Sequence, residues 1–312
     1  MRADLLDVFA VRSNPLRWQQ PERIAKDWIE LMLDSGVNLH IVEVQYGERP
    51  FVYADTPHIN HIGLRAKTLC WSKENALNVG ISRVPGARYI CTSDSDVFFR
   101  KKSWAADTVH ALQIHDVVQP WSDAYDLGPN DEHMQHHVSF CKVMMHGGPL
   151  LPENKKWWKW AGGPYDYPHS GYCWAWTRQA LDWVGGLFDV GGMGSGDHHM
   201  ALALAGKAER SLPGGCNQNY KDAVTRWQQR AVQHINGNVG YVPGTIEHRF
   251  HGAKADRKYV GRWDMFVKHG FDPVTDLKKN THGVIEWAGN KPDLKREFEL
   301  YLMSRREDAN VF

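Results

Sequence analysis

The chain has 312 residues, of which 42% are hydrophobic and 23% are charged, and its 37 Lys and Arg residues against 36 Asp and Glu residues give a formal net charge of +1. This is the composition of a globular protein whose length suits one large α/β domain with additions, or two domains at most. The balanced charge argues against a dedicated nucleic-acid-binding chain, although an average can hide a local basic face.

The sequence predicts no targeting segment and no membrane span. Its first apolar run is interrupted by Asp7 and Arg12 and lacks the cleavage site of a signal peptide, and no apolar stretch is long enough to cross a bilayer. The five cysteines are odd in number, widely spaced and without a CxxC pair: Cys70, Cys91, Cys141, Cys173 and Cys216. We expect them to be reduced, in a cytoplasmic protein, or in the host cytoplasm if the source is a virus. The oligomeric state is not indicated.

Strands and helices are predicted to alternate along the first part of the chain. Apolar runs predict the strands, and the apolar spacing after Pro21 predicts a helix that ends near Gly36. The predicted order is a strand at residues 5–11, that helix, a strand at 37–44, a helix within 67–83, a strand at 89–92, and a strand at 117–118 after a further helix. This alternation indicates a mixed, mostly parallel α/β sheet flanked by helices on both faces.

The middle and the end of the chain differ in composition from the first part. Residues 123–167 are polar and rich in Gly and Pro, which favours an irregular, mobile loop that contacts the substrate. The cluster His133, His136 and His137 within it is expected to be solvated. After residue 252 the sequence becomes that of charged helices. We therefore predict a catalytic domain at 1–252 and a C-terminal helical extension at 253–312.

Two carboxylates follow the predicted strand at 89–92 directly. Ligands of such sheets bind beyond the carboxyl ends of the strands, where the segments Arg12 to Asn14 and Asp94 to Asp96 both fall. Carboxylates at i and i+2 are a recurrent way to hold Mn²⁺ or Mg²⁺. Asp96 is interpreted as the metal ligand and Asp94 as the residue nearer the ribose or the metal's waters. The alternative is that both cap a turn after the strand.

Further segments extend this pattern. They are Trp71 to Gly80, Tyr89 to Phe99, Ser170 to Arg178, Gly185 to Asp189, Gly192 to His199 and Thr245 to His248. In order and spacing they resemble the β-1,4-galactosyltransferase-like enzymes of the GT-A, family 2-like group, over roughly residues 70–100 and 170–252. The sequence departs from that family where Gly196, His198 and His199 replace acidic residues.

The resemblance implies a GT-A fold, which is a Rossmann-like nucleotide-sugar-binding fold, in a bacterial or bacteriophage member. It implies a hexosyltransferase that moves a sugar from a nucleoside-diphosphate donor, UDP-hexose above all, to an acceptor hydroxyl, with Mn²⁺ or Mg²⁺ and with inversion. Asp197 stands at the family's catalytic base, although it would equally cap the following helix. His248 stands at a metal-binding histidine, and His251 is the second candidate ligand.

The same resemblance implies the donor-binding residues. Lys73 and Asn78 lie in the segment before the metal-binding strand, and Arg12 and Ser13 lie where the base and ribose dock in this fold. A cation at Lys73 would attract a diphosphate, but a solvated helix end explains the residue equally well.

The acceptor is the least defined part of the prediction. Trp158, Trp160, Trp174 and His198 are the candidate contacts, because indole rings stack on sugars; packing under a loop is the alternative for Trp158 and Trp160. The expected acceptor is a glycan, or alternatively 5-hydroxymethylpyrimidine in viral DNA. Two other classes also remain open: a non-catalytic sugar- or nucleotide-binding module, and a metal-dependent nucleic-acid enzyme.

Overall fold

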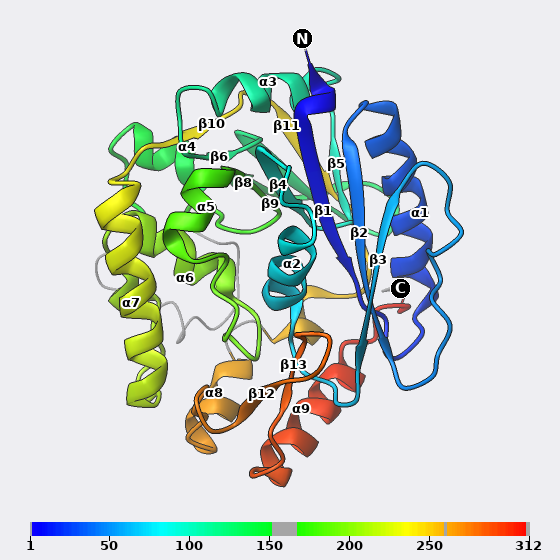
Figure 1. Cartoon of the computed structure of the whole chain (residues 1–312), viewed down its shortest axis with the longest axis vertical. Coiled ribbons are helices and arrows are strands. Elements are labelled where there is room, and N and C mark those ends of the chain that lie inside the picture. The colour runs from blue at the N-terminus through cyan, green and yellow to red at the C-terminus, as the bar shows by residue number, and fades with distance from the viewer. Residues whose placement is uncertain (1, 152–166, 259–260, 310–312) are drawn as a thin grey trace.

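The computed structural model describes residues 2–151, 167–258 and 261–309, and a seven-stranded sheet lies at its centre (Figure 1). The strand order is β10-β6-β9-β4-β1-β2-β3. These strands are β1 (Leu6–Arg12), β2 (Asn38–Tyr46), β3 (Asn60–Ala66), β4 (Tyr89–Ser93), β6 (Val117–Gln119), β9 (Cys173–Thr177) and β10 (Val239–Tyr241). Neighbouring strands are parallel except at β9, which is antiparallel to β4 and β6. The predicted mixed, mostly parallel sheet is confirmed.

Helices cover both faces of this sheet, as predicted. One face packs against α1 (Gln19–Asp34) and α3 (Trp104–Ala111). The other packs against α2 (Lys73–Ser82), α4 (Phe140–Met145), α5 (Arg178–Val184), α6 (Gly196–Leu204) and α7 (Gln218–His234). Successive side chains of a strand point to opposite faces, so Val8 and Ala10 join the first core while Phe9 joins the second. Strands buried on both faces are mostly apolar, and the buried polar residues Asp7 and His40 on β1 and β2 pair with each other at 2.8 Å.

A second, four-stranded sheet extends the structure beside the end of β4. Its order is β5-β11-β7-β8, with β5 (Val97–Phe99), β7 (Asp123–Leu127), β8 (His133–Val138) and β11 (Thr245–His248). The prediction of an irregular segment at 123–167 is therefore wrong for its first part, which forms β7, β8 and α4. Residues 152–166 lie outside the described residues, so the prediction of a mobile loop is untested there.

The segment after residue 252 contains a β-hairpin as well as helices. Its elements are α8 (Gly261–Lys268), β12 (Leu277–Lys279), β13 (Ile285–Trp287) and α9 (Pro292–Ser304). They gather at the end of the molecule towards which β1 runs (Figure 1). They therefore lie at the edge where the parallel strands end. Within the described part of the chain, no helix combines the length and the apolar character that a membrane crossing requires.

Candidate functional site

A cavity of about 360 Å³ opens beyond the carboxyl ends of β1 and β4. It is lined by the end of β1, by the turn between β4 and β5, by residues 70–74, by the start of α6 and by α9. This volume falls in the usual range for small-molecule sites, and the position is the one where ligands bind in open parallel sheets. The groups of polar residues around Asp96 and around Asp197 both line this cavity.

The two segments predicted to meet at this edge do meet. Arg12, at the end of β1, donates from Nη1 to the Ser95 hydroxyl at 2.7 Å. The backbone N–H of Asp94 donates to the carbonyl of Tyr172 at 2.9 Å, which fixes the turn against β9. Arg12 also forms an ion pair with Glu22 at 3.1 Å. The turn that carries Asp94 and Asp96 is therefore held from both sides.

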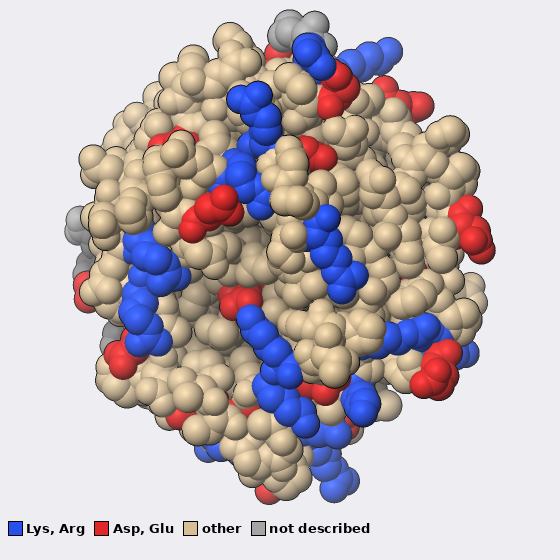
Figure 2. Space-filling model, in the orientation of Figure 1, with Lys and Arg blue, Asp and Glu red and all other residues tan. Residues whose placement is uncertain are grey.

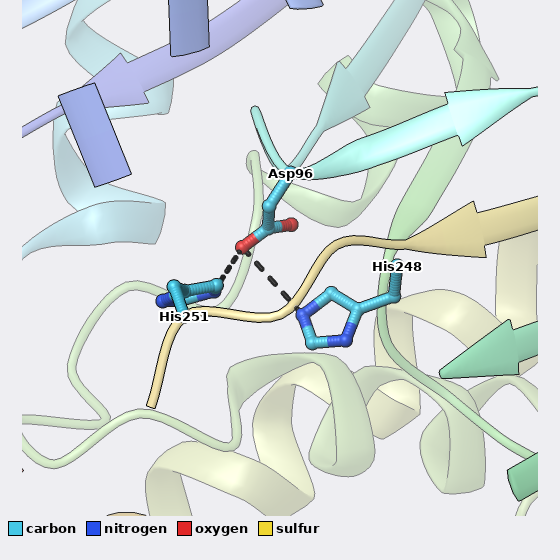
Figure 3. Close-up of side chains that lie close together, drawn as sticks. All are labelled: Asp96, His248 and His251. Carbon is cyan, nitrogen blue, oxygen red and sulfur yellow. Dashed lines mark hydrogen bonds and ion pairs between the residues drawn. The ribbon is translucent and has the colours of Figure 1, made fainter. Parts of the chain in front are cut away.

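Asp96, His248 and His251 form the candidate metal site. Their ligand atoms all lie within 4.8 Å of one another. The Oδ2 atom of Asp96 is 2.8 Å from Nε2 of His251 and 3.6 Å from Nε2 of His248, so both imidazoles point at one carboxylate oxygen (Figure 3). The Oδ1 atom of Asp96 is buried without a hydrogen-bond partner among the described residues. Converging carboxylate and imidazole groups with an unused oxygen fit a divalent cation such as Mn²⁺.

Charge within the cluster sets its protonation. Burial opposes ionisation of Asp96, but the imidazoles hold the pKa of its carboxyl well below the ordinary range. Burial likewise opposes a charge on His248, yet the carboxylates of Asp96 and Asp126 raise its pKa to about 10. A positive charge on the imidazole of His248 is thus strongly favoured between the carboxylates of Asp96 and Asp126.

Asp126, at the end of β7, supports the cluster from behind. Its Oδ1 atom lies 2.8 Å from Nδ1 of His248 and accepts the hydroxyl of Tyr172 at 2.9 Å. The other carboxylate oxygen, Oδ2, accepts from Nε2 of His137 at 2.5 Å and from Nζ of Lys254. Metal-binding histidines commonly present their other ring nitrogen to a carboxylate in this way. Asp126 therefore orients His248.

A buried arginine stands beside the second imidazole. Arg257 places Nη2 2.8 Å from Nε2 of His251 and 3.3 Å from its carbonyl. Oδ2 of Asp96 lies 2.8 Å from the same nitrogen, and since a guanidinium only donates and a carboxylate only accepts, Nε2 cannot satisfy both partners at once. A cationic group thus already occupies the neighbourhood of the nitrogen that would bind a metal.

Asp197 lies in the first turn of α6 and lines the same cavity. Its Oδ1 atom accepts the backbone N–H of His198 at 2.8 Å, but the N-cap of α6 is Ser195, so the interpretation of Asp197 as the N-cap is wrong. Burial raises the pKa of its carboxyl, and the charge of Lys73 opposes this rise. A Cβ atom at Gly171 would approach the Oδ2 atom of Asp197 to 2.9 Å, so this glycine keeps the second oxygen accessible. A raised pKa and an accessible oxygen suit a general base.

Lys73 and Glu74 stand at the start of α2, near Asp94 and Asp197. Lys73 donates from Nζ to Oδ1 of Asp94. Burial raises the pKa of Glu74 to about 7, with Lys73 opposing the rise and Asp197 adding to it. This second buried carboxylate beside the candidate base was not predicted.

The remaining predicted residues separate into groups. Ser13 lines the cavity and contacts the hydroxyl of Tyr46 at 3.2 Å, and the buried His198 also lines it. Asn78 instead bonds both backbone groups of Leu187 at 2.9 Å, which fixes the loop after α5. Trp174 is buried in the core and donates to the carbonyl of Ser170 at 2.7 Å. Trp158 and Trp160 lie outside the described residues.

The histidine cluster at 133–137 departs from its predicted solvated state at one position. His137 is buried on Asp126, while His133 and His136 are exposed beside Tyr125. Strand alternation on β8 separates His137 from its neighbour His136, and His133 lies beyond the register shift in the pairing of β7 with β8. The turn residues Gly128 to Asn130 between two alternating segments are the signal that would have indicated this hairpin.

No family model matches this sequence, and no curated protein matches it either. Among solved structures, the chain is similar to S. aureus TarS residues 1–349 in complex with UDP-GlcNAc, with 11% identity, coverage of 85% of this chain and 64% of that one, and a TM-score of 0.42. It is similar to mannosyltransferase PcManGT from Pyrobaculum calidifontis in complex with GDP-Man and Mn²⁺, with 14% identity, coverage of 85% and 60%, and a TM-score of 0.39. The chain thus spans less than two thirds of the length of both.

A third similar structure is glucosyl-3-phosphoglycerate synthase from Mycobacterium tuberculosis in complex with Mn²⁺, UDP and phosphoglyceric acid. It is 12% identical, with coverage of 85% of this chain and 75% of that one, and a TM-score of 0.40. All three TM-scores are below 0.5, so the site is interpreted from its own geometry.

Proposed function

We propose that this chain is a divalent-metal-dependent glycosyltransferase that moves a sugar from a nucleoside-diphosphate sugar to an acceptor hydroxyl. One observation carries this proposal: the Asp96, His248 and His251 cluster lines the same cavity as Asp197. A metal site beside a partly buried carboxylate supplies the two functions that sugar transfer needs, namely charge stabilisation at the leaving group and removal of a proton from the acceptor. The order and spacing of the sequence segments support the same reaction class.

The donor, UDP-hexose in this proposal, would lie between the end of β1 and the start of α2. Lys73 and Arg12 are cations at the two sides of the turn that holds Asp94 and Asp96, and they suit the diphosphate. Asp96, His248 and His251 would hold the metal. When bound, Mn²⁺ or Mg²⁺ acts as a Lewis acid that stabilises negative charge on the departing diphosphate.

Asp197 would act as the base of an inverting transfer. It accepts the proton of the acceptor hydroxyl as the oxygen attacks the anomeric carbon from the side opposite the leaving diphosphate. Its raised pKa makes it a stronger proton acceptor than an exposed carboxylate, and the charge of Lys73 opposes the rise.

We propose a glycan as the acceptor, with hydroxymethylated DNA as the rival tested in the same assay. Lys and Arg residues on the face shown in Figure 2 stand in separate groups with Asp and Glu between them. Duplex DNA is instead bound by surfaces that neutralise many phosphates together. This interspersed charge favours an uncharged or weakly charged acceptor.

The proposal is tested by incubating the full chain with a panel of UDP- and GDP-sugars and Mn²⁺, with and without chelator. Donor hydrolysis that depends on Mn²⁺ and is lost in Asp96→Asn is the expected result. Mass spectrometry against glycan and hydroxymethylated-DNA acceptors then identifies the acceptor class. Hydrolysis at the same rate in chelator, or no turnover of any donor, would overturn the proposal.

A further inference from the structure

A carboxylate from the C-terminal segment reaches the candidate metal site. The Oε2 atom of Glu307, beyond the end of α9, lies 3.5 Å from Nδ1 of His251. Glu307 is buried, with 7% of its surface exposed, although the neighbouring sequence is strongly charged. Arg305 forms an ion pair with its other oxygen. A buried carboxylate in such a segment needs a structural or functional partner, because burying an unpaired charge is costly.

Contacts on both sides of Glu307 fix its position. Asp308 accepts the backbone N–H groups of Gln19 and Gln20 at 3.0 and 2.7 Å, at the N-terminus of α1, where a negative charge is favourable. The guanidinium of Arg305 lies 5.5 Å from the ring centroid of Trp71, beside α2. The segment 305–308 therefore lies along the edge of the cavity, and Glu307 is held between two anchors.

The two histidines of the cluster have similar but not identical surroundings: Nδ1 of His248 lies 2.8 Å from Asp126, whereas Nδ1 of His251 is buried without a hydrogen bond among the described residues and lies 3.5 Å from Glu307. His248 faces Asp126 through Nδ1 and Asp96 through Nε2, and His251 faces Glu307 through Nδ1 and Asp96 through Nε2. Each imidazole thus lies between an outer carboxylate and the shared inner carboxylate. This is the arrangement that orients histidine ligands in metal sites.

Nε2 of His251 has two competing partners. Nη2 of Arg257 and Oδ2 of Asp96 both lie 2.8 Å from it, and since a guanidinium only donates and a carboxylate only accepts, Nε2 cannot satisfy both contacts at once. With the ring proton on Nδ1, which faces Glu307 at 3.5 Å, Nε2 carries the lone pair that a metal ligand needs.

We infer that Glu307 is a positioning residue of the metal site, which holds His251 through its Nδ1–H so that Nε2 faces the ion. The inference rests on the proposed function, because it assumes that Asp96, His248 and His251 bind a divalent cation. It makes residues 305–308 part of the active centre although they lie far from Asp96 along the chain.

The test compares Mn²⁺ binding by the full-length wild type, Glu307→Gln and Glu307→Ala, without substrates. Titration followed by electron paramagnetic resonance gives the affinity, and electron spin echo envelope modulation counts the imidazole nitrogens on Mn²⁺. We expect two nitrogens in the wild type and one in Glu307→Ala, with affinity about 10–100-fold weaker in Glu307→Ala. Glu307→Gln should lose less, because its amide oxygen still accepts from Nδ1–H.

Arg306→Gln is the matched control. Arg306 pairs with Asp256 at 2.9 Å on the surface, so its loss changes the same segment without touching His251. Asp308→Asn loosens the segment while keeping the carboxylate of Glu307. Unchanged affinity and nitrogen count in Glu307→Ala, or an equal loss in Arg306→Gln, would overturn the inference and leave the proposed function standing. Absence of Mn²⁺ binding in the wild type would instead overturn the proposed metal site and this inference with it.

Discussion

Asp126 holds Nδ1 of His248 at 2.8 Å, although the two residues are 122 positions apart in the chain. The same carboxylate accepts from His137, Tyr172 and Lys254. This buried group therefore joins β7, β8, β11 and the residue before β9 behind the candidate metal site. Its negative charge is compensated from all sides, which keeps the pKa of Asp126 far below its ordinary range despite burial.

Asp126→Asn should destabilise the fold. An amide has one acceptor oxygen and no charge, so Lys254 and His248 lose a counterion and His137 competes for the remaining acceptor in a buried site. Breaking such a network by removing one partner costs about 3–5 kcal/mol. The free energy of unfolding is measured by urea denaturation. Asp131→Asn is the control, because Asp131 pairs with Arg249 on the surface, where about 0–1 kcal/mol is expected. Equal effects of the two changes would contradict the role assigned to Asp126.

Asp96→Asn should abolish stabilisation by Mn²⁺. A ligand that binds only the folded state stabilises it by about 2.7 kcal/mol at a concentration 100 times its Kd. The Tm of the wild type should therefore rise with Mn²⁺, while that of Asp96→Asn should stay constant. Asp182→Asn, an exposed carboxylate on α5, should behave like the wild type. A Tm that rises equally in Asp96→Asn would place the ion elsewhere.

Asp197→Asn should separate transfer from donor binding. Asn keeps the size of the side chain, and its amide oxygen can still accept the N–H of His198, so the fold should persist. It cannot take up a proton, so sugar transfer should fall by about 10²–10⁴-fold. Calorimetry with UDP and Mn²⁺ should give the wild-type affinity. Transfer at the parent rate would show that Asp197 is not the base, whereas loss of UDP binding would assign it a structural role.

Glu74 should make stability depend on pH. Its pKa is about 7 in the folded protein, above the ordinary value near 4.3, so the folded state binds a proton more tightly than the unfolded state. The stabilisation that proton binding by Glu74 gives to the folded state is fully present below about pH 4.3, and it is lost as the pH rises to about 7. The loss amounts to up to about 3 kcal/mol.

Glu74→Gln removes this titration. The difference in unfolding free energy between wild type and Glu74→Gln is measured in urea at pH 5 and at pH 8. Taking the difference cancels the effects of all other titrating groups, which the two proteins share. We expect the wild type to lose stability relative to the variant between these two values. A difference that is the same at both values would show that Glu74 titrates normally.

Local patterns in the sequence were sufficient to predict the core of the site. The apolar runs before Arg12 and Asp94 mark buried strands, and in a parallel sheet the ends of such strands meet at one edge. The hydrogen bond between Arg12 and Ser95 at 2.7 Å is the direct result. Helix α6 also contains Met200, Leu202 and Leu204 as predicted, although it begins at Gly196, before Asp197.

The outer residues were not predictable in the same way. Asp126 lies in a segment rich in turn residues, and its partners are set by the pairing of β7 with β8 and β11 rather than by neighbouring positions. Glu307 follows two arginines, and such a charged segment is ordinarily solvated. Its burial arises only when α9 packs and Asp308 reaches α1. Tertiary contacts of this kind leave no periodic signal.

The strand order has a consequence for the sequence of folding events. The first 93 residues supply the four adjacent parallel strands β3, β2, β1 and β4, whereas the partner of Asp96 at His251 comes 155 positions later. Contacts that close long loops form late, and segments held by few such contacts open first. We expect backbone amides of β1 to exchange with solvent only on global unfolding, and those around His251 to exchange through smaller openings. The site would then be the last part of the fold to assemble and the first to come apart.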